Sequence, residues 1–368
     1  MKIAILTSSR ADYGIYLPLL KELKKDPFFD MQIIAFGTHL SAKHGNTVNE
    51  ITESGYPVAH RVDTIPDGDS PAAIAAAMGK TMINFARVWE ENTYDLVIAL
   101  GDRYEMFAAC ASAVPFGVPI AHIHGGETTL GAIDDTFRDS ITQMATYHFT
   151  TTDQYRNRVL ALKGSGNGVY KVGALSVDNL KTLPLLSIEA FKEKFNIDLN
   201  KPSILITFHP ETVAFEKNER YIVELIAALR EIETYQLIIT MPNADTMGNM
   251  IRKHLSDFIA SSKNAIGIES FGALGYLSCM KHSTMMLGNT SSGFVEAAFF
   301  SKYVINLGNR QSGRILSPNI CNCEIKKDSI LRSVADFANR ELPEKIEIYG
   351  NGTSAIQICT ILKNIVRD

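Results

Sequence analysis

The feature that most constrains the fold of this chain is a repeated alternation of short apolar segments with segments of helical periodicity. Amphipathic stretches such as residues 14–25 and 104–114 lie between the apolar ones. Strands that alternate with helices form parallel sheets covered by helices on both faces. In the first half of the chain, the predicted strands are KIAILTSS (2–9), MQIIAFGTH (31–39), DLVIALGD (95–102), PIAHIHGG (119–126) and YHFTTT (147–152).

The same alternation restarts after residues 175–203, a crossing segment without a strand pattern. The later predicted strands are SILITFHP (203–210), YQLIITMPN (235–243), AIGIES (265–270), MMLGN (285–289) and YVINLG (303–308). A chain of 368 residues exceeds what one core usually supports. The sequence therefore predicts two Rossmann-like doubly wound α/β domains facing a central cleft, residues 1–175 and 176–352. The last helix, 353–368, is expected to rejoin the first domain.

Composition and charge exclude several classes of protein. The net charge is -4 and no run of lysine or arginine suggests a nucleic-acid partner, so we expect a small-molecule ligand. No apolar run approaches the ~20 residues that span a bilayer, and the start of the chain is too quickly polar for a signal peptide. We expect a cytoplasmic protein. Five scattered cysteines favour reduced thiols, and Cys321-x-Cys323 is too isolated to predict a metal site.

Polar residues follow nearly every predicted strand. Ligands of parallel sheets bind outside the carboxyl ends of the strands, so these residues predict a binding site at that edge in each domain. Those of the first domain are Arg10, Asp12, Asp102, Arg103, His124 and Glu127. Those of the second are His209, Asn243, Thr290, Ser291, Ser292, Glu296, Arg310 and Arg314.

The densest group of ionisable residues lies in HIHGGETTLGAIDDTFRDSI (122–141). It holds His124, Glu127, Asp134, Asp135 and Arg138 at a strand-to-helix crossing. Alternation along a strand puts His122 and His124 on the same side, where a lone histidine is more often a core residue than a ligand. Asp134 and Asp135 are equally consistent with acidic residues at the start of a helix, where the helix dipole favours negative charge.

A second motif, GNTSSGFVEAA (288–298), is either a helix cap or a phosphate site. Small residues let the backbone approach an anion, and the free N–H groups of a helix start receive it. In the phosphate-site interpretation, the carboxylate of Glu296 accepts hydrogen bonds from a ribose diol. By contrast, GSGNG (164–168) lacks the strand-to-helix spacing of a dinucleotide motif, so we interpret it as a turn and expect no bound NAD.

Taken together, these stretches resemble the hydrolysing UDP-N-acetylglucosamine 2-epimerases, in the branch that feeds sialic-acid and legionaminic-acid synthesis. The resemblance covers nearly the whole chain. It implies a fold of the glycosyltransferase-B type, a UDP-sugar ligand, no metal or cofactor, and a homodimer or homotetramer. The matching motifs, in order, are SSRADYG, GDRYE, HIHGGE, GAIDDTFRDSIT, YHF, FHPET, PNAD, GNTSSGFVEA and VINLGNRQSGR.

The resemblance also implies an activity: conversion of UDP-N-acetylglucosamine to N-acetylmannosamine and UDP. Departure of UDP gives oxocarbenium character at C1, which acidifies the C2 proton and allows elimination to a glycal. Water then adds at C1 while a proton returns to the opposite face of C2. Such a reaction requires cations near the diphosphate and acid/base groups near the ring.

Residue by residue, the resemblance implies these roles. Asp102 and Asp134 match carboxylates of proton transfer, and Asp135 and Arg138 match the neighbours that orient them. His209 matches a family histidine that lies beside the phosphates. The positions that match nucleotide ligands are Arg10, Arg103, Asn243, Thr290, Ser291 and Glu296, with Ser292 beside them and Arg310 or Arg314 to complete the site.

Two departures bear on the substrate. Relatives have HIEGGE or HVEAG, with a glutamate where this chain has His124, and the loop GGETTLGAIDD (125–135) is one residue longer. Either His124 or Glu127 takes over proton transfer, since an imidazole titrates near neutral pH, or the substrate differs. The alternatives are a hydrolysing 2-epimerase of UDP-N,N'-diacetylbacillosamine, a glycosyltransferase of the same fold, and a non-catalytic UDP-sugar binder.

Overall fold

A computed structural model describes residues 1–213, 215–242, 247–338, 340–341 and 346–365. Contacts between residues divide the chain into two compact units. Unit 1 comprises Met1–Glu127, Asp134–Thr182 and the segment from Ile348 onward, and unit 2 comprises Thr128–Ile133 and Leu183–Glu347. The sequence puts the domain boundaries at 175/176 and 352/353, whereas the contacts of unit 1 continue to Thr182 and resume at Ile348.

Unit 1 is built on a parallel sheet of seven strands, in the order β3-β2-β1-β4-β5-β6-β7. Successive crossovers wind outward in both directions from β1, which is the doubly wound arrangement. The strands are β1 (Lys2–Thr7), β2 (Asp30–Phe36), β3 (Val58–Val62), β4 (Leu96–Leu100), β5 (Ile120–Ile123), β6 (Tyr147–Thr150) and β7 (Val169–Lys171).

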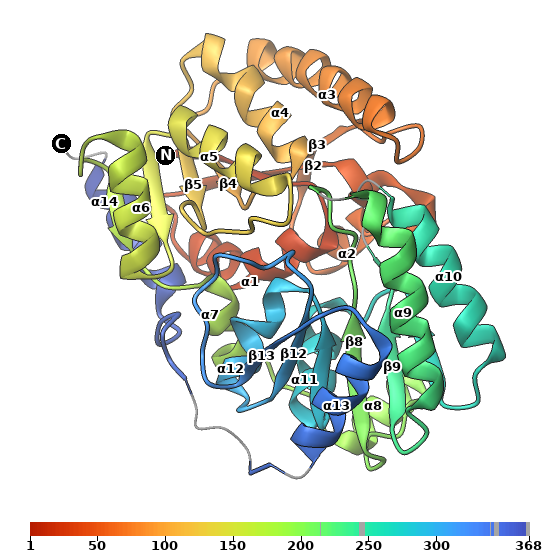
Figure 1. The fold of residues 1–368 in the computed structure, drawn as a ribbon. Coiled ribbons are helices and arrows are strands. Elements are labelled where there is room, and N and C mark those ends of the chain that lie inside the picture. Colours follow the sequence, from red (N-terminus) through yellow and green to blue (C-terminus); the bar gives the residue numbers. More distant parts are fainter. Residues whose placement is uncertain (214, 243–246, 339, 342–345, 366–368) are drawn as a thin grey trace. The chain divides into compact units, whose positions relative to one another are not determined.

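Helices cover both faces of this sheet (Figure 1). Along β1, Ile3 and Ile5 belong to one buried cluster, whereas Ala4 and Leu6 belong to another. The unit includes 3-10 turns η1 (Gly37–Leu40), η2 (Ala42–His44) and η3 (Val114–Phe116). Its helices are α1 (Arg10–Lys25), α2 (Val48–Glu53), α3 (Pro71–Glu91), α4 (Tyr104–Ala113), α5 (Asp134–Met144), α6 (Asp153–Lys163), α7 (Leu175–Thr182) and α14 (Ser354–Ile365).

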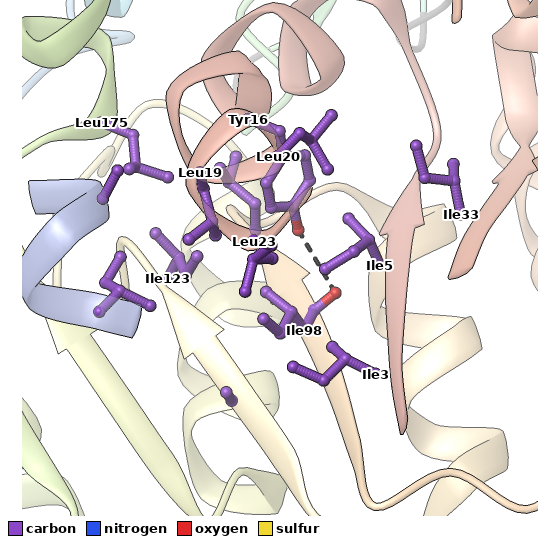
Figure 2. Packing of buried hydrophobic residues seen from close by; sticks show 14 of the residues in the cluster. Ile3, Ile5, Tyr16, Leu19, Leu20, Leu23, Ile33, Ile98, Ile123 and Leu175 are labelled. Carbon is purple, nitrogen blue, oxygen red and sulfur yellow. Dashed lines mark hydrogen bonds between the residues drawn. The ribbon is translucent and has the colours of Figure 1, made fainter. Parts of the chain in front are cut away.

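Helix α1 packs on the sheet through residues spaced one helical turn apart. Tyr16, Leu19, Leu20 and Leu23 are fully buried, and Figure 2 shows them facing strand residues such as Ile98. The hydroxyl of Tyr16 donates to the carbonyl of Ile98 at 3.4 Å, so its polar end is satisfied inside the core. This packing fixes the start of α1, where Arg10 lies.

The last helix of the chain, α14, belongs to unit 1, where it packs against α1 and α7. A buried carboxylate anchors its first turn. Asp178 of α7 accepts hydrogen bonds from the backbone N–H groups of Ser354 (3.1 Å) and Ala355 (2.8 Å). These are groups that a helix start leaves without an intrahelical acceptor.

Unit 2 repeats the architecture with a parallel sheet of six strands, in the order β10-β9-β8-β11-β12-β13. Along β8, Ile204 and Ile206 face one buried cluster and Leu205 faces another, so this sheet is also covered on both faces. The strands are β8 (Ser203–Thr207), β9 (Gln236–Thr240), β10 (Ala265–Ile268), β11 (Met285–Gly288), β12 (Val304–Leu307) and β13 (Ile320–Cys323). The helices are α8 (Ile188–Phe195), α9 (Asn218–Glu231), α10 (Gly248–Ser261), α11 (Gly272–His282), α12 (Glu296–Phe299) and α13 (Lys327–Ala338), with 3-10 turns η4 (Phe215–Lys217) and η5 (Ser291–Gly293).

The predicted fold class, two parallel α/β domains, is confirmed. Three strands were not predicted: β3, β7 and β13. Each is an edge strand of its sheet and carries polar residues, so it lacks a continuous apolar run. Within the described residues, no helix has both the length and the apolar character needed to cross a bilayer.

Candidate functional site

Three neighbouring strands bring the predicted residues of unit 1 to one edge. Strands β1, β4 and β5 are adjacent and parallel, so their carboxyl ends coincide. Arg10 is the first residue of α1, Asp102 and Arg103 follow β4, and His124 follows β5. Asp134 and Asp135 begin α5.

His122 is a core residue with satisfied hydrogen bonds. Its Nε2 lies 2.7 Å from the carbonyl oxygen of Gly101 and its Nδ1 lies 3.1 Å from the hydroxyl of Thr142. Burial lowers the pKa of His122 to about 4, and burial likewise lowers the pKa of the adjacent His148 to about 3. Both rings are therefore neutral near pH 7. Through its contact with the carbonyl of Gly101, His122 also fixes the residue that precedes Asp102.

His124 departs from the predicted strand alternation. Strand β5 ends at Ile123, and His124 has a φ of 66°, a left-handed conformation that is uncommon outside glycine. Its N–H donates to the carbonyl of Phe149 on β6 at 3.0 Å. Gly126, also left-handed, lies so close to α6 that a Cβ would overlap the carbonyl oxygen of Tyr155. The glycine thus lets the turn after His124 approach α6.

Glu127 is almost fully buried and held at both its carboxylate and its backbone. Its Oε1 lies 3.7 Å from Nδ1 of His124 and accepts a hydrogen bond from the hydroxyl of Thr151 at 3.2 Å. Its carbonyl oxygen accepts from Arg138 and from Arg158, each at 2.8 Å. The carboxylate therefore faces the imidazole of His124 from a fixed position.

Arg138, which is 2% exposed, joins three of the predicted residues. Its guanidinium donates to Asp102, to Asp135 (2.7 Å) and to the carbonyl of Glu127. A buried cation needs such partners to offset its lost hydration. Asp135 and Arg138 were predicted to orient Asp102 and Asp134, and in the structure Arg138 contacts Asp102, Asp135 and the backbone of Glu127.

Sequence analysis missed Arg158 of α6, which donates to the same carbonyl of Glu127 and to Asp135 (3.1 Å). It follows no strand and belongs to none of the motifs quoted above. Its contact with Glu127 spans 31 residues of sequence, so only the packing of α6 reveals it.

Arg103 has a carboxylate partner of its own. Its Nε and Nη2 donate to the fully buried Glu105 at 3.2 and 3.1 Å. The carboxylate of Glu105 therefore partly offsets the charge of Arg103.

The turn that carries Arg10 is held by Asp12, which accepts from the hydroxyl of Thr7 (2.6 Å) and the N–H of Ser8 (2.8 Å). Burial alone would raise the pKa of Asp12, but His39 and these donors outweigh it and lower that pKa. Asp12 is therefore a buried structural carboxylate in a helix cap.

Asn289 connects the predicted residues of unit 2. Its side chain accepts from the N–H of His209 (2.7 Å) and donates to the carbonyl of His209 (2.8 Å). Its own carbonyl accepts from Arg310 (3.2 Å) and Gln311 (2.9 Å), and Gln311 in turn accepts from Arg314 (2.6 Å). The backbone of His209 and the side chain of Arg310 thus meet at Asn289, and Arg314 is joined to them through Gln311. Asn289 and Gln311 were not predicted, although both lie within quoted motifs.

The motif GNTSSGFVEAA forms two short elements rather than one helix. Thr290 caps the 3-10 turn Ser291–Gly293, its hydroxyl accepting from the N–H of Ser292 at 3.5 Å. Glu296 begins the four-residue helix α12. The hydroxyl of Ser292 lies 2.6 Å from that of Tyr276 on α11, which sequence analysis also missed. A row of hydroxyls therefore follows β11.

Asn243, which was predicted to bind the nucleotide, lies outside the described residues. In the part of the chain that the structure describes, no group of three or more histidine, cysteine, aspartate or glutamate side chains is arranged to hold a metal ion.

Comparison with known proteins identifies relatives over the full length of the chain. The sequence pattern of UDP-N-acetylglucosamine 2-epimerases matches residues 21–363. The hydrolysing UDP-N,N'-diacetylbacillosamine 2-epimerase of Legionella pneumophila is 31% identical over 364 residues, covering 99% of this chain and 96% of the relative. The GDP/UDP-N,N'-diacetylbacillosamine 2-epimerase of Campylobacter jejuni is 34% identical over 325 residues, covering 88% and 84%.

A solved structure shares the fold. The UDP-N-acetylglucosamine 2-epimerase of Neisseria meningitidis, bound to UDP-N-acetylglucosamine, matches with a TM-score of 0.80 at 19% identity, covering 99% of this chain and all of that one. The two parallel-sheet units therefore form a fold of the glycosyltransferase-B type.

The buried His122 predicts a pH-dependent stability. Its pKa is about 4 in the folded chain, so between pH 6.5 and 4 only the unfolded chain takes up this proton. We expect the free energy of unfolding in urea to fall as pH drops through this window, with His122 contributing about 3 kcal/mol. His122→Gln should flatten this dependence relative to the wild type, whereas the control His60→Gln, at a partly exposed position, should not. An unchanged slope in His122→Gln would contradict the assignment.

Proposed function

The chain belongs to the UDP-N-acetylglucosamine 2-epimerase family, and from this premise we propose that it is a hydrolysing 2-epimerase of a UDP-sugar. The observation that carries the proposal is the acid/base cluster at the strand ends of unit 1. Asp102, Asp135 and the backbone of Glu127 meet at Arg138, and His124 lies beside the carboxylate of Glu127.

This cluster suits a reaction in which a proton leaves and returns at one carbon. Loss of UDP from C1 acidifies the C2 proton, a base removes it to give a glycal, and an acid returns a proton to the opposite face as water adds at C1. Two acid/base groups on different sides of the ring are required. We assign them to His124 on one side and to Asp102 or Asp134 on the other, with Asp135 and Arg138 orienting Asp102.

Of His124 and Glu127, we assign the proton transfer to His124. Glu127 is 4% exposed, and its carboxylate is already engaged by Thr151 and faces Nδ1 of the imidazole. A carboxylate in that position orients the ring and stabilises the imidazolium, as in other carboxylate–histidine pairs. Nε2, on the opposite edge of the ring, is then the atom that exchanges the proton.

We assign the nucleotide to unit 2. Arg310 donates to a neutral carbonyl, and its Nε is buried without a hydrogen-bond partner among the described residues, so its charge suits a diphosphate. His209 and Arg314, joined to it through Asn289 and Gln311, are assigned to the same anion. The remaining ligands assigned in unit 2 are Asn243, Thr290, Ser291 and Ser292, with Glu296 for the ribose. Arg10 and Arg103 keep the role of nucleotide ligands that the resemblance implies.

The relatives alter the order of the candidate sugars. Sequence analysis put UDP-N-acetylglucosamine first, with UDP-N,N'-diacetylbacillosamine as the alternative. Two relatives more than 30% identical are named for the diacetylbacillosamine nucleotide. The UDP-N-acetylglucosamine 2-epimerase of Neisseria meningitidis, 19% identical in the superposed structures, is 26% identical when the sequences alone are aligned over 366 residues. We therefore propose UDP-N,N'-diacetylbacillosamine as the first candidate and UDP-N-acetylglucosamine as the second.

We also propose a homodimer or homotetramer. Helix α3 carries an exposed apolar face in unit 1, with Met82 41% and Ile83 64% exposed and Ala72, Ala75 and Ala76 about two to three turns earlier. Residues at this spacing lie on one side of a helix. We propose that this face of α3 contacts a second copy of the chain, because most soluble homo-oligomers are closed, symmetric assemblies.

The reaction is tested by proton NMR of the enzyme in D2O with UDP-N,N'-diacetylbacillosamine, its GDP counterpart and UDP-N-acetylglucosamine in separate tubes. We expect release of the nucleoside diphosphate and a 2-epimerised free sugar that carries deuterium at C2, because the proton returns from solvent. Turnover of UDP-N-acetylglucosamine alone would reverse the order of the two sugars. UDP binding without turnover in any tube would refute the epimerase and leave a non-catalytic binder.

Substitutions separate the roles of His124 and Glu127. We expect His124→Ala to lower kcat by about 100-fold or more. Glu127→Gln keeps a partner for Thr151 but removes the charge beside the ring, so we expect a smaller loss of kcat and a shift of the limb of the pH profile due to His124 toward lower pH. If Glu127 itself transferred the proton, Glu127→Gln would be the inactive variant and His124→Gln would retain activity.

Light scattering tests the assembly. Replacing Met82 and Ile83 together with glutamate puts two charges on the apolar face of α3, and we expect the particle mass to fall, to that of one chain for a dimer and to that of two chains for a tetramer. Val223→Glu, at a position of α9 that is 51% exposed, is the matched control and should leave the mass unchanged. An assembly that survives the double substitution would exclude α3 as the contact surface.

A further inference from the structure

Arg158 shares both of its principal acceptors with Arg138. Each guanidinium donates Nη1 to the carbonyl oxygen of Glu127 at 2.8 Å. Each also binds one oxygen of the same carboxylate, since Asp135 accepts from Arg138 through Oδ1 (2.7 Å) and from Arg158 through Oδ2 (3.1 Å). The two cations therefore hold Glu127 and Asp135 from two sides.

Beyond these shared acceptors, the two arginines differ. Arg138 continues to Asp102, one of the acid/base candidates. Arg158 continues to Asp139, one turn further along α5, at 2.7 Å. The result is a continuous chain of contacts from Asp139 through Arg158, Asp135 and Arg138 to Asp102. Formally it contains two positive and three negative side chains, so loss of one arginine leaves one cation for three carboxylates.

Helix α6, which carries Arg158, packs closely against the segment that follows His124. The carbonyl of Tyr155, in its first turn, is the atom that a Cβ at Gly126 would overlap, and Thr151 just before it donates to the carboxylate of Glu127. Arg158 thus extends from an element that already contacts the segment after His124. Burial would lower the pKa of Arg158, but Asp135 and Asp139 outweigh it and raise that pKa, so the cation is permanent.

We propose that Arg158 is a positioning residue for the proton transfers assigned above, a role that rests on the proposed function. By holding Asp135 and the backbone of Glu127 from the second side, Arg158 keeps both acceptors where Arg138 can bind them and Asp102 together, and it keeps the carboxylate of Glu127 against His124. Arg158 itself contacts neither substrate nor a reacting atom in this scheme. A lysine cannot replace it, because one ammonium group cannot reach three acceptors with the geometry of a planar fork.

The kinetic test compares Arg158→Ala and Arg158→Lys with Arg156→Ala. Arg156 lies on the same helix, and its side chain forms no hydrogen bond or ion pair with another described residue. We expect Arg158→Ala to lower kcat by about 10- to 100-fold with KM within about twofold, since misplaced acid/base groups slow the chemical step. Arg158→Lys should recover only part of this loss. Guanidinium ion at millimolar concentration should partly restore Arg158→Ala, because the side chain is 28% exposed and its site accessible.

A crystal structure of Arg158→Ala gives a readout that does not depend on activity. We expect the guanidinium of Arg138 to turn toward the vacated side of Asp135 and its contact with Asp102 to be lost. An unchanged Arg138–Asp102 contact, or an unchanged kcat, would overturn the proposal. So would a loss of kcat that is not restored by guanidinium and accompanies a matching fall in Tm, since that indicates a structural role. If the wild type turns over no UDP-sugar, the proposed function fails, and the crystal structure still decides whether Arg158 positions Arg138.

Discussion

The arrangement of unit 1 at its strand ends depends on the buried guanidinium of Arg138. Removing a cation from water is costly, and only well-placed acceptors offset that cost. Arg138 obtains them from three separate segments: Asp102 after β4, the carbonyl of Glu127 after β5, and Asp135 in the first turn of α5. The same hydrogen bonds that make its burial tolerable therefore fix the relative positions of the carboxylates.

In the described part of unit 2, an arginine is held by neutral groups and not by carboxylates. Asn289 holds the backbone of His209 through two hydrogen bonds, and its carbonyl orients Arg310. An amide fixes geometry without neutralising the charge of the arginine it binds. This difference matches the chemistry assigned to each unit, since proton transfer needs carboxylates held in place, whereas Arg310, bound to a neutral carbonyl, keeps its positive charge for a diphosphate.

The sequence was sufficient to predict the fold class and the residues that follow the strands. Strands buried on both faces are continuous apolar runs, and the parallel order puts their carboxyl ends at one edge. Contacts that depend on helix packing could not be predicted. Arg158 reaches Glu127 across 31 residues and Asn289 reaches His209 across 80, and no local pattern encodes either contact. The predicted helix after β11 divides into η5 and α12, a boundary that periodicity does not fix.

The motif HIH shows how environment separates two identical side chains. His122 lies within β5, is fully buried and has acceptor or donor groups at both ring nitrogens, so it is a neutral structural group. His124 lies one residue beyond the strand in a strained left-handed conformation, with a carboxylate 3.7 Å from Nδ1. Such strain persists only where the surroundings enforce it, here through the bond to Phe149 and the close approach of Gly126 to α6. The turn removes His124 from the core pattern of the strand and brings it to Glu127, which gives a physical reason for assigning the chemistry to the second histidine and not to the first.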